Sequence, residues 1–231
     1  MDYRDRHVIV TGGTGALGAA VVGALVDAGA TCHVPYVVAA EAERFALRQH
    51  ERVKLVAMSD LADEADVARL YGSVDRLWAS IHLVGGFAMA EVAQTTKTEL
   101  MKQIEMNLVT SFLCSRGAVN AMTGRGGRIV NVAARHALEP RGGANMTAYT
   151  ATKAGLAGLT QALAEEVAKD RIWVNAVAPS IMDTPANRAA MPKADHAAWP
   201  KVEEVAATIL FLASPQNAVT RGAIVPVYGK T

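Results

Sequence analysis

Thr11-Gly12-Gly13-Thr14-Gly15-Ala16-Leu17-Gly18 follows a short β-branched run at residues 7–10 and leads into an apolar segment at residues 19–26. This order predicts a strand, a glycine-rich turn and a helix. Because glycine has no Cβ, such a turn lets backbone N–H groups and the positive end of a helix approach a pyrophosphate. A tight strand-to-helix turn can also need glycine for purely structural reasons. The position directly after the first strand favours a dinucleotide site.

A second pair of residues suggests a proton donor. Tyr149 and Lys153 are four residues apart in a helical pattern at residues 148–169, so both side chains project from one face. A free tyrosine titrates near pH 10, and an adjacent ammonium with an oxidised nicotinamide ring is expected to lower that pKa. An isolated pair would simply pack on a helix surface. Its occurrence together with the glycine-rich turn favours a reductase site.

The rest of the chain alternates between strand and helix patterns. Further apolar or β-branched runs lie at residues 31–38, 53–58, 77–84, 128–132, 172–177 and 222–227. The alternation predicts an α/β fold: a single Rossmann-type doubly wound domain over residues 1–231, with a seven-stranded, mostly parallel sheet and helices on both faces. Residues 179–200 form the longest irregular stretch and are predicted to be a substrate loop or lid.

Composition limits the classes of partner. The formal net charge of the 231 residues is +1, which shows no bias toward nucleic acid or an anionic membrane. No apolar run approaches the roughly 20 residues that span a bilayer. The charged N-terminus runs directly into the first strand, so no signal peptide is expected. Two cysteines, Cys32 and Cys114, indicate a reduced, cytoplasmic setting, and the scattered histidines indicate no metal site.

Over nearly its whole length the chain resembles the short-chain dehydrogenase/reductase family. Asp60 matches that family's adenine-binding aspartate, Asn107 its water-holding asparagine, and Thr184 the residue that binds the nicotinamide amide. Residues 83–86 stand in the place of its Asn-Asn-Ala-Gly motif, without either asparagine. The resemblance implies Tyr149, Lys153 and Asn107 as catalytic residues. It implies as cofactor-binding residues Thr11, Gly12, Thr14, Gly15, Leu17, Gly18, Tyr36, Asp60, Leu61, Gly85, Gly86, Tyr149, Lys153, Pro179 and Thr184.

One residue of the family pattern is missing. The family has a serine at the end of the fifth strand, where this chain has Ala133 and Ala134, and neither can donate a hydrogen bond. Counting back from Tyr149 by the family spacing reaches His136 instead. Three explanations follow: His136 or Arg135 supplies the donor, catalysis has been lost, or the substrate does not need the serine.

The third explanation has further support, because within the family the chain most resembles the dihydropteridine reductases, which also lack the serine. The shared features are the Gly-Gly-aromatic turn that ends in Phe87 and the order of residues between Asp183 and Trp199. An aromatic side chain there could stack on a flat heterocycle. The predicted substrate residues are Phe87, His136, Met182 and Met191.

The reaction expected from this resemblance is hydride transfer from NAD(P)H to a small oxidised, planar heterocycle such as a quinonoid dihydropterin, with Tyr149 supplying the proton. A quinonoid ring is already activated, so polarisation by serine matters less. One alternative is a carbonyl or hydroxyl oxidoreductase with a nonstandard donor. Another is a non-catalytic NAD(P)-binding scaffold or redox sensor.

Cofactor preference depends on the end of the second strand, where an acidic residue selects NAD and a basic one NADP. That position falls at Tyr36, which carries neither charge, and no Arg or Lys lies near it or in the glycine-rich turn. These residues favour NADH. Glu41 could turn back toward the ribose, but a helix-surface position is the preferred interpretation. The resemblance also implies a homodimer or homotetramer.

Overall fold

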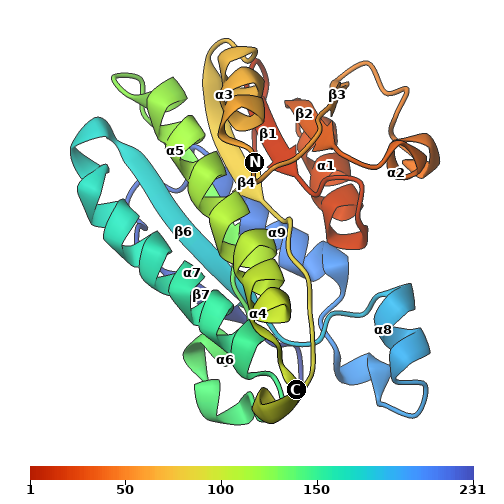
Figure 1. Ribbon diagram of the computed structural model, residues 1–231. Coiled ribbons are helices and arrows are strands. Elements are labelled where there is room, and N and C mark those ends of the chain that lie inside the picture. The colour runs from red at the N-terminus through yellow and green to blue at the C-terminus, as the bar shows by residue number, and fades with distance from the viewer.

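The computed structural model describes residues 1–231, and its strands form one sheet of seven parallel strands (Figure 1). The strand order is β3-β2-β1-β4-β5-β6-β7, which reverses direction between β1 and β4. This is the Rossmann-type α/β fold that the sequence predicted. The strands are β1 His7–Thr11, β2 Thr31–Tyr36, β3 Val53–Ala57, β4 Leu77–His82, β5 Gly127–Val132, β6 Ile172–Pro179 and β7 Ile224–Val227.

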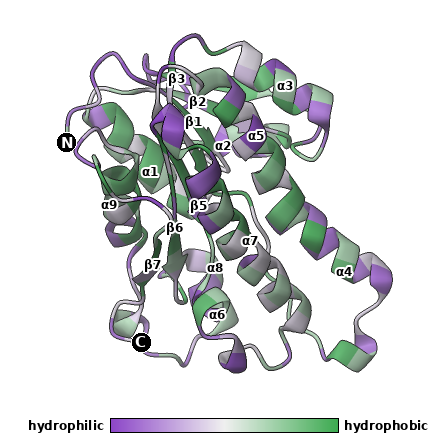
Figure 2. Ribbon diagram, turned by 90° about the vertical axis from the view of Figure 1, so that its left-hand side faces the viewer, coloured by the Kyte–Doolittle hydropathy of each residue, from purple (hydrophilic) through white to green (hydrophobic).

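Helices cover both faces of the sheet. Helices α1 and α9 pack on one face, whereas α3, α5 and α7 pack on the other (Figures 1 and 2). Figure 2 shows the hydrophobic strands between these two layers. The helices are α1 Ala16–Asp27, α2 Ala39–Arg44, α3 Glu64–Gly72, α4 Lys97–Ile104, α5 Thr110–Met122, α6 Arg135–Leu138, α7 Thr147–Glu166, α8 Pro185–Ala190 and α9 Val202–Ala213. None of the helices combines the length and the apolar character that crossing a membrane requires.

The hydrophobic core is divided by the sheet. The larger cluster joins α1 and α9 to residues such as Val8 and Ile81, and the second joins α3 and α5 to residues such as Ile9 and Ile129. Alternate residues of one strand therefore pack against opposite helix layers, because successive side chains of a strand point to opposite faces of the sheet. Both layers fix the carboxyl ends of the strands, where ligands of such sheets bind.

Two strands, β2 and β4, end two residues earlier than predicted. Strand β2 ends at Tyr36 rather than at residue 38, because Val37 and Val38 are half exposed and Val38 caps the start of α2. Strand β4 ends at His82, because the chain then turns toward Gly85 and Gly86. Hydrophobic runs extend past the paired region in both cases, because the following residues line a cavity at the sheet edge.

The helical stretch from Lys97 to Met122 is interrupted. Helices α4 and α5 are joined by one π-helical turn, Glu105–Val109, and Asn107 lies in the middle of it. Such turns widen a helix locally and are frequent at functional sites. The predicted lid at residues 179–200 contains α8 and a 3₁₀ turn, His196–Ala198.

Candidate active site

The glycine-rich turn lies at the carboxyl end of β1 and is closely packed. Gly12 has φ +68°, and a Cβ on it would lie 3.0 Å from the Val84 nitrogen. A Cβ on Gly18 would lie 2.6 Å from the Gly13 Cα and closer still to the Gly12 oxygen. Gly15 caps α1 without any side-chain hydrogen bond, so no side chain occupies that helix start. Free N–H groups and the helix dipole are what a pyrophosphate requires, so this turn fits a dinucleotide.

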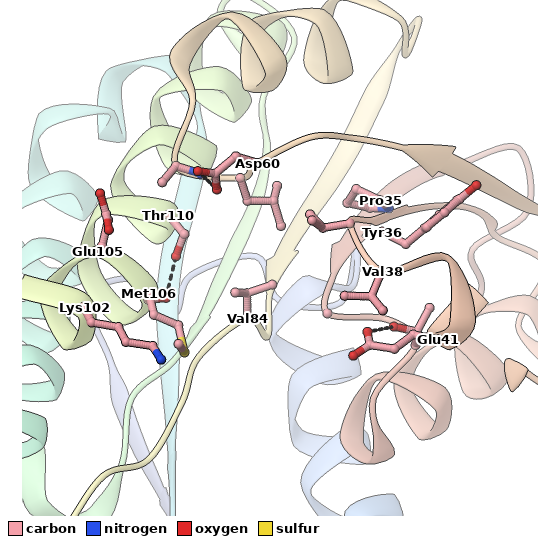
Figure 3. Close-up of a pocket in the computed structure, with 15 residues that line it drawn as sticks. Pro35, Tyr36, Val38, Glu41, Asp60, Val84, Lys102, Glu105, Met106 and Thr110 are labelled. Atoms are coloured by element: carbon pink, nitrogen blue, oxygen red, sulfur yellow. Dashed lines mark hydrogen bonds between the residues drawn. The ribbon is translucent and has the colours of Figure 1, made fainter. Parts of the chain in front are cut away.

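A cavity of about 330 Å³ lies beside this turn (Figure 3). Five residues predicted to bind the cofactor line it: Gly12, Thr14, Tyr36, Asp60 and Leu61. Figure 3 shows Tyr36 and Glu41 on one wall, Lys102 and Met106 on the opposite wall, and Asp60 and Val84 between them. The sequence offered Glu41 only as the less favoured ribose-binding residue and did not indicate Lys102, Met106 or Val84, because these residues reach the cavity from elements that only the fold brings together.

Tyr149 and Lys153 project from the first turns of α7, as their spacing predicted. The Lys153 side chain is 5% exposed and donates to the Val132 carbonyl oxygen at 2.8 Å. No carboxylate pairs with the ammonium, so burial lowers the pKa of Lys153 to about 8. Its nitrogen lies 6.0 Å from the centre of the Tyr149 ring.

The expected lowering of the Tyr149 pKa is not found in the protein alone. Burial raises the pKa of the phenol to about 12. Without the cofactor, burial dominates because Lys153 directs its ammonium to a backbone carbonyl. Phenolate is therefore disfavoured, and the phenol holds its proton. Phe87 meets the Tyr149 ring edge-on, with ring centres 5.1 Å apart.

Asn107 holds the turn after β4 rather than facing solvent. Its side-chain oxygen accepts from the Gly86 N–H at 3.0 Å, and its amide donates to the Gly86 oxygen at 3.0 Å. The amide also donates to Gln103 at 3.1 Å. A Cβ on Gly85 would lie 2.8 Å from the Asn107 oxygen and 3.2 Å from the Lys153 nitrogen. These close approaches place the turn between Asn107 and Lys153.

Gln103 was not identified from the sequence, although a signal existed. It precedes Asn107 by one helical turn, a spacing that places the two side chains on one face. Its side chain is buried and orients the Asn107 amide. A polar side chain one turn before a functional asparagine was therefore the pattern to look for.

The position of the missing serine has no hydroxyl. Ala133 and Ala134 follow β5 and are buried, and α6 begins directly after them. Arg135 is committed elsewhere, because its guanidinium donates to Glu139 at 2.7 Å and lies over the Tyr228 ring. His136 is half-buried, and its Nδ1 atom is buried without a hydrogen-bond partner. Of the two replacement donors, only His136 is uncommitted.

The site candidates in residues 179–200, the predicted lid, have different surroundings. The Thr184 hydroxyl accepts from the Asn187 N–H and so caps α8. Met182 packs against the core on the α1 and α9 side, and the Met191 carbonyl accepts from His196. Asp183 pairs with Arg188, which holds the pKa of the carboxyl below its usual range.

A second cavity of about 330 Å³ is lined by Phe87, whose ring packs against Tyr149. Phe87, Met89, Met146 and Ala148 supply apolar lining. Polar or charged groups come from Thr95, Glu99, Lys102 and Gln103. Its mouth is apolar, since Phe87 and Met89 are each more than 60% exposed. Of the predicted substrate residues Phe87 lines this cavity, whereas His136, Met182 and Met191 line neither of the two.

Comparisons with known proteins agree with this geometry. The sequence model of the short chain dehydrogenase family matches residues 6–195. Cis-4-hydroxycyclohexanecarboxylate dehydrogenase of Sinomonas cyclohexanicum is 34% identical over 98% of this chain and 96% of its own length. L-xylulose reductase of Bos taurus is 31% identical over 99% of this chain and 98% of its own length.

A solved structure is similar throughout. A blue fluorescent protein from a metagenomic library, in complex with NADPH, superposes with a TM-score of 0.88 at 26% identity, over 100% of this chain and 99% of its own. The family match covers the glycine-rich turn, Tyr149 and Lys153. The chain therefore belongs to the short-chain dehydrogenase family, whose members are NAD(P)-dependent oxidoreductases.

Proposed function

We propose that this oxidoreductase reduces a small, planar, electron-poor substrate of the quinonoid dihydropterin type. NAD(P)H is the hydride donor. The observation that carries the proposal is the pair of buried alanines, Ala133 and Ala134, at the end of β5. A carbonyl substrate needs a donor that stabilises the developing charge on its oxygen. A quinonoid ring has less need of one.

Each of the three catalytic residues has a definite task in this proposal. The nicotinamide, when bound, supplies the hydride. Tyr149 keeps its proton because burial raises the pKa of the phenol to about 12, and it can hand that proton to a ring nitrogen. Lys153 is fixed by the Val132 carbonyl oxygen. Asn107 holds the Gly86 backbone and so fixes the turn after β4.

The apolar part of the lining of the second cavity supports a flat substrate. Phe87 packs against Tyr149 in a T-shaped pair and is 62% exposed, so part of its ring is open to a heterocycle. Met89, Met106 and Met146 add polarisable, adaptable surface.

A second candidate is the oxidation or reduction of an ordinary alcohol or ketone. It is favoured by the names of relatives such as the cyclohexanecarboxylate dehydrogenase and L-xylulose reductase. In this case His136 would supply the missing donor, because its Nδ1 atom has no partner in the structure. A homodimer or homotetramer in the cytoplasm stays a prediction under either function.

The test is the rate of NADH and NADPH oxidation with a quinonoid dihydropterin, measured beside simple ketones. We expect pterin turnover that falls in Tyr149→Phe, with ketones inert. Ketone turnover that falls in His136→Ala, with the pterin inert, would instead establish the second candidate. Cofactor binding with no turnover of either substrate class would refute both and favour a non-catalytic scaffold.

A further inference from the structure

The end of β2 leaves the choice of cofactor undecided. In Rossmann-type folds an acidic residue about 20 positions after the glycine-rich turn binds the ribose 2′-OH of NAD, whereas a basic one accepts the 2′-phosphate of NADP. Tyr36 ends β2 and lines the cavity, but it carries no charge at neutral pH. Discrimination must therefore come from another group on the same wall.

Glu41 provides that group. It lies 23 residues after Gly18, in the first turn of α2, and it lines the cavity beside Tyr36. The Thr14 hydroxyl donates to its carboxylate at 3.2 Å, a contact drawn as a dashed line in Figure 3. The carboxylate therefore bridges the glycine-rich turn and the segment after β2. Glu41 lies exposed on the surface of α2, as the sequence predicted, and this contact also directs its carboxylate toward the glycine-rich turn.

Most of the charged residues that line the cavity beside the glycine-rich turn are acidic. Three acidic residues line it, Glu41, Asp60 and Glu105, and the only basic lining residue is Lys102. Figure 3 shows Lys102 on the wall opposite Glu41. No guanidinium or ammonium stands on the Glu41 side to neutralise a phosphate. A 2′-phosphate there would meet an unpaired carboxylate, whereas a 2′-hydroxyl could donate a hydrogen bond to it.

We propose that Glu41, held by Thr14, is the residue that makes this protein select NADH over NADPH. The inference rests on the proposed cofactor-dependent function and adds its cofactor preference. Glu41 thus replaces the uncharged Tyr36 as the specificity-determining residue. Thr14 limits the motion of the carboxylate and so sharpens the discrimination.

Direct binding tests the proposal without any substrate. The fluorescence of NADH and NADPH is titrated with the whole chain, which yields a Kd for each nucleotide. We expect NADH to bind at least about tenfold more tightly, because like-charge juxtaposition penalises NADPH. Since Glu41 is exposed, the preference should shrink as salt is raised.

Three variants separate charge from fold. Glu41→Gln keeps the size and removes the charge, so the NADPH Kd should fall about tenfold while the NADH Kd rises, and Glu41→Arg should reverse the preference. Thr14→Val should weaken discrimination only in part. Glu43→Gln, on the same helix but outside the cavity, is the matched control and should change neither Kd.

Two results would overturn the assignment. Equal or tighter binding of NADPH by the unmodified chain would do so, as would a Kd ratio that Glu41→Gln leaves unchanged. If neither nucleotide binds the folded chain, the proposed function itself is refuted, and this inference with it. The outcomes can be distinguished, because nucleotide binding and preference are measured on the unmodified protein, whereas the role of Glu41 is measured on the variant that lacks its charge.

Discussion

His82 makes the free energy of unfolding depend on pH, because its imidazole is buried in a series of hydrogen bonds across the sheet. Its Nδ1 atom lies 2.8 Å from the Asn131 oxygen, and its Nε2 atom lies 2.8 Å from the Ser80 hydroxyl. The Asn131 amide donates to Thr160 at 2.9 Å, so its oxygen faces His82 and the Nδ1 atom carries the proton. The imidazole is therefore neutral in the folded protein.

Burial lowers the pKa of His82 from 6.5 to about 4. Between these values the unfolded chain binds a proton that the folded protein does not, so stability falls as the pH falls. The full contribution is present above pH 6.5 and is lost as the pH drops toward 4. Integrating that difference gives a loss of roughly 2 kcal/mol between about pH 7.5 and about pH 5.

Urea unfolding at several pH values measures this effect. His82→Gln offers one donor and one acceptor but does not titrate, so its free energy of unfolding should fall by about 2 kcal/mol less over the same range. His33 remains in both proteins, and its own pKa is also lowered to about 4 by burial, so it contributes equally to both curves. If the free energy of unfolding depends on pH equally in the two proteins, His82 is not the cause of the loss.

Three further predictions concern local geometry. Gly18→Ala should abolish NADH binding, measured by calorimetry, because the added Cβ would lie 2.6 Å from the Gly13 Cα; retained affinity would contradict the packing. Gly158→Ala, in the exposed middle of α7 with no neighbour within 4 Å, should raise the free energy of unfolding by about 0.5–1 kcal/mol, and a loss of stability would contradict the open space. Asn107→Leu should cost about 1–3 kcal/mol and weaken NADH binding, because the Gly86 backbone loses its partners; unchanged unfolding in urea would show that the clamp does not matter.

The sequence could predict the parts of the site that depend on local spacing. The glycine-rich turn and the Tyr149–Lys153 pair are short segments whose geometry follows from one turn and one helix. The parallel sheet followed from the alternation of strand and helix patterns. These features were readable because neighbours in the chain remain neighbours in space.

Other features needed the fold. Glu41 contacts Thr14, which lies 27 residues earlier in the sequence. The series of hydrogen bonds that runs from Tyr71 through His82 to Thr160 joins side chains from two helices and two strands. The pKa of Tyr149 depended on burial, which no spacing reveals. Val37 and Val38 extended a hydrophobic run past the end of β2, because residues that line a ligand cavity resemble residues that fill a core.

Ala134→Ser tests whether reduction proceeds without a serine hydroxyl. The variant adds a donor where the structure has a buried methyl group, and a single such donor can change the rate of carbonyl chemistry by about 10²–10³-fold. We expect the unmodified enzyme to turn over a quinonoid dihydropterin rapidly, and the rate to change by less than about threefold in the variant. An unmodified enzyme that is inert toward the pterin, together with a variant that gains ketone turnover, would show that a hydroxyl donor at this position is needed.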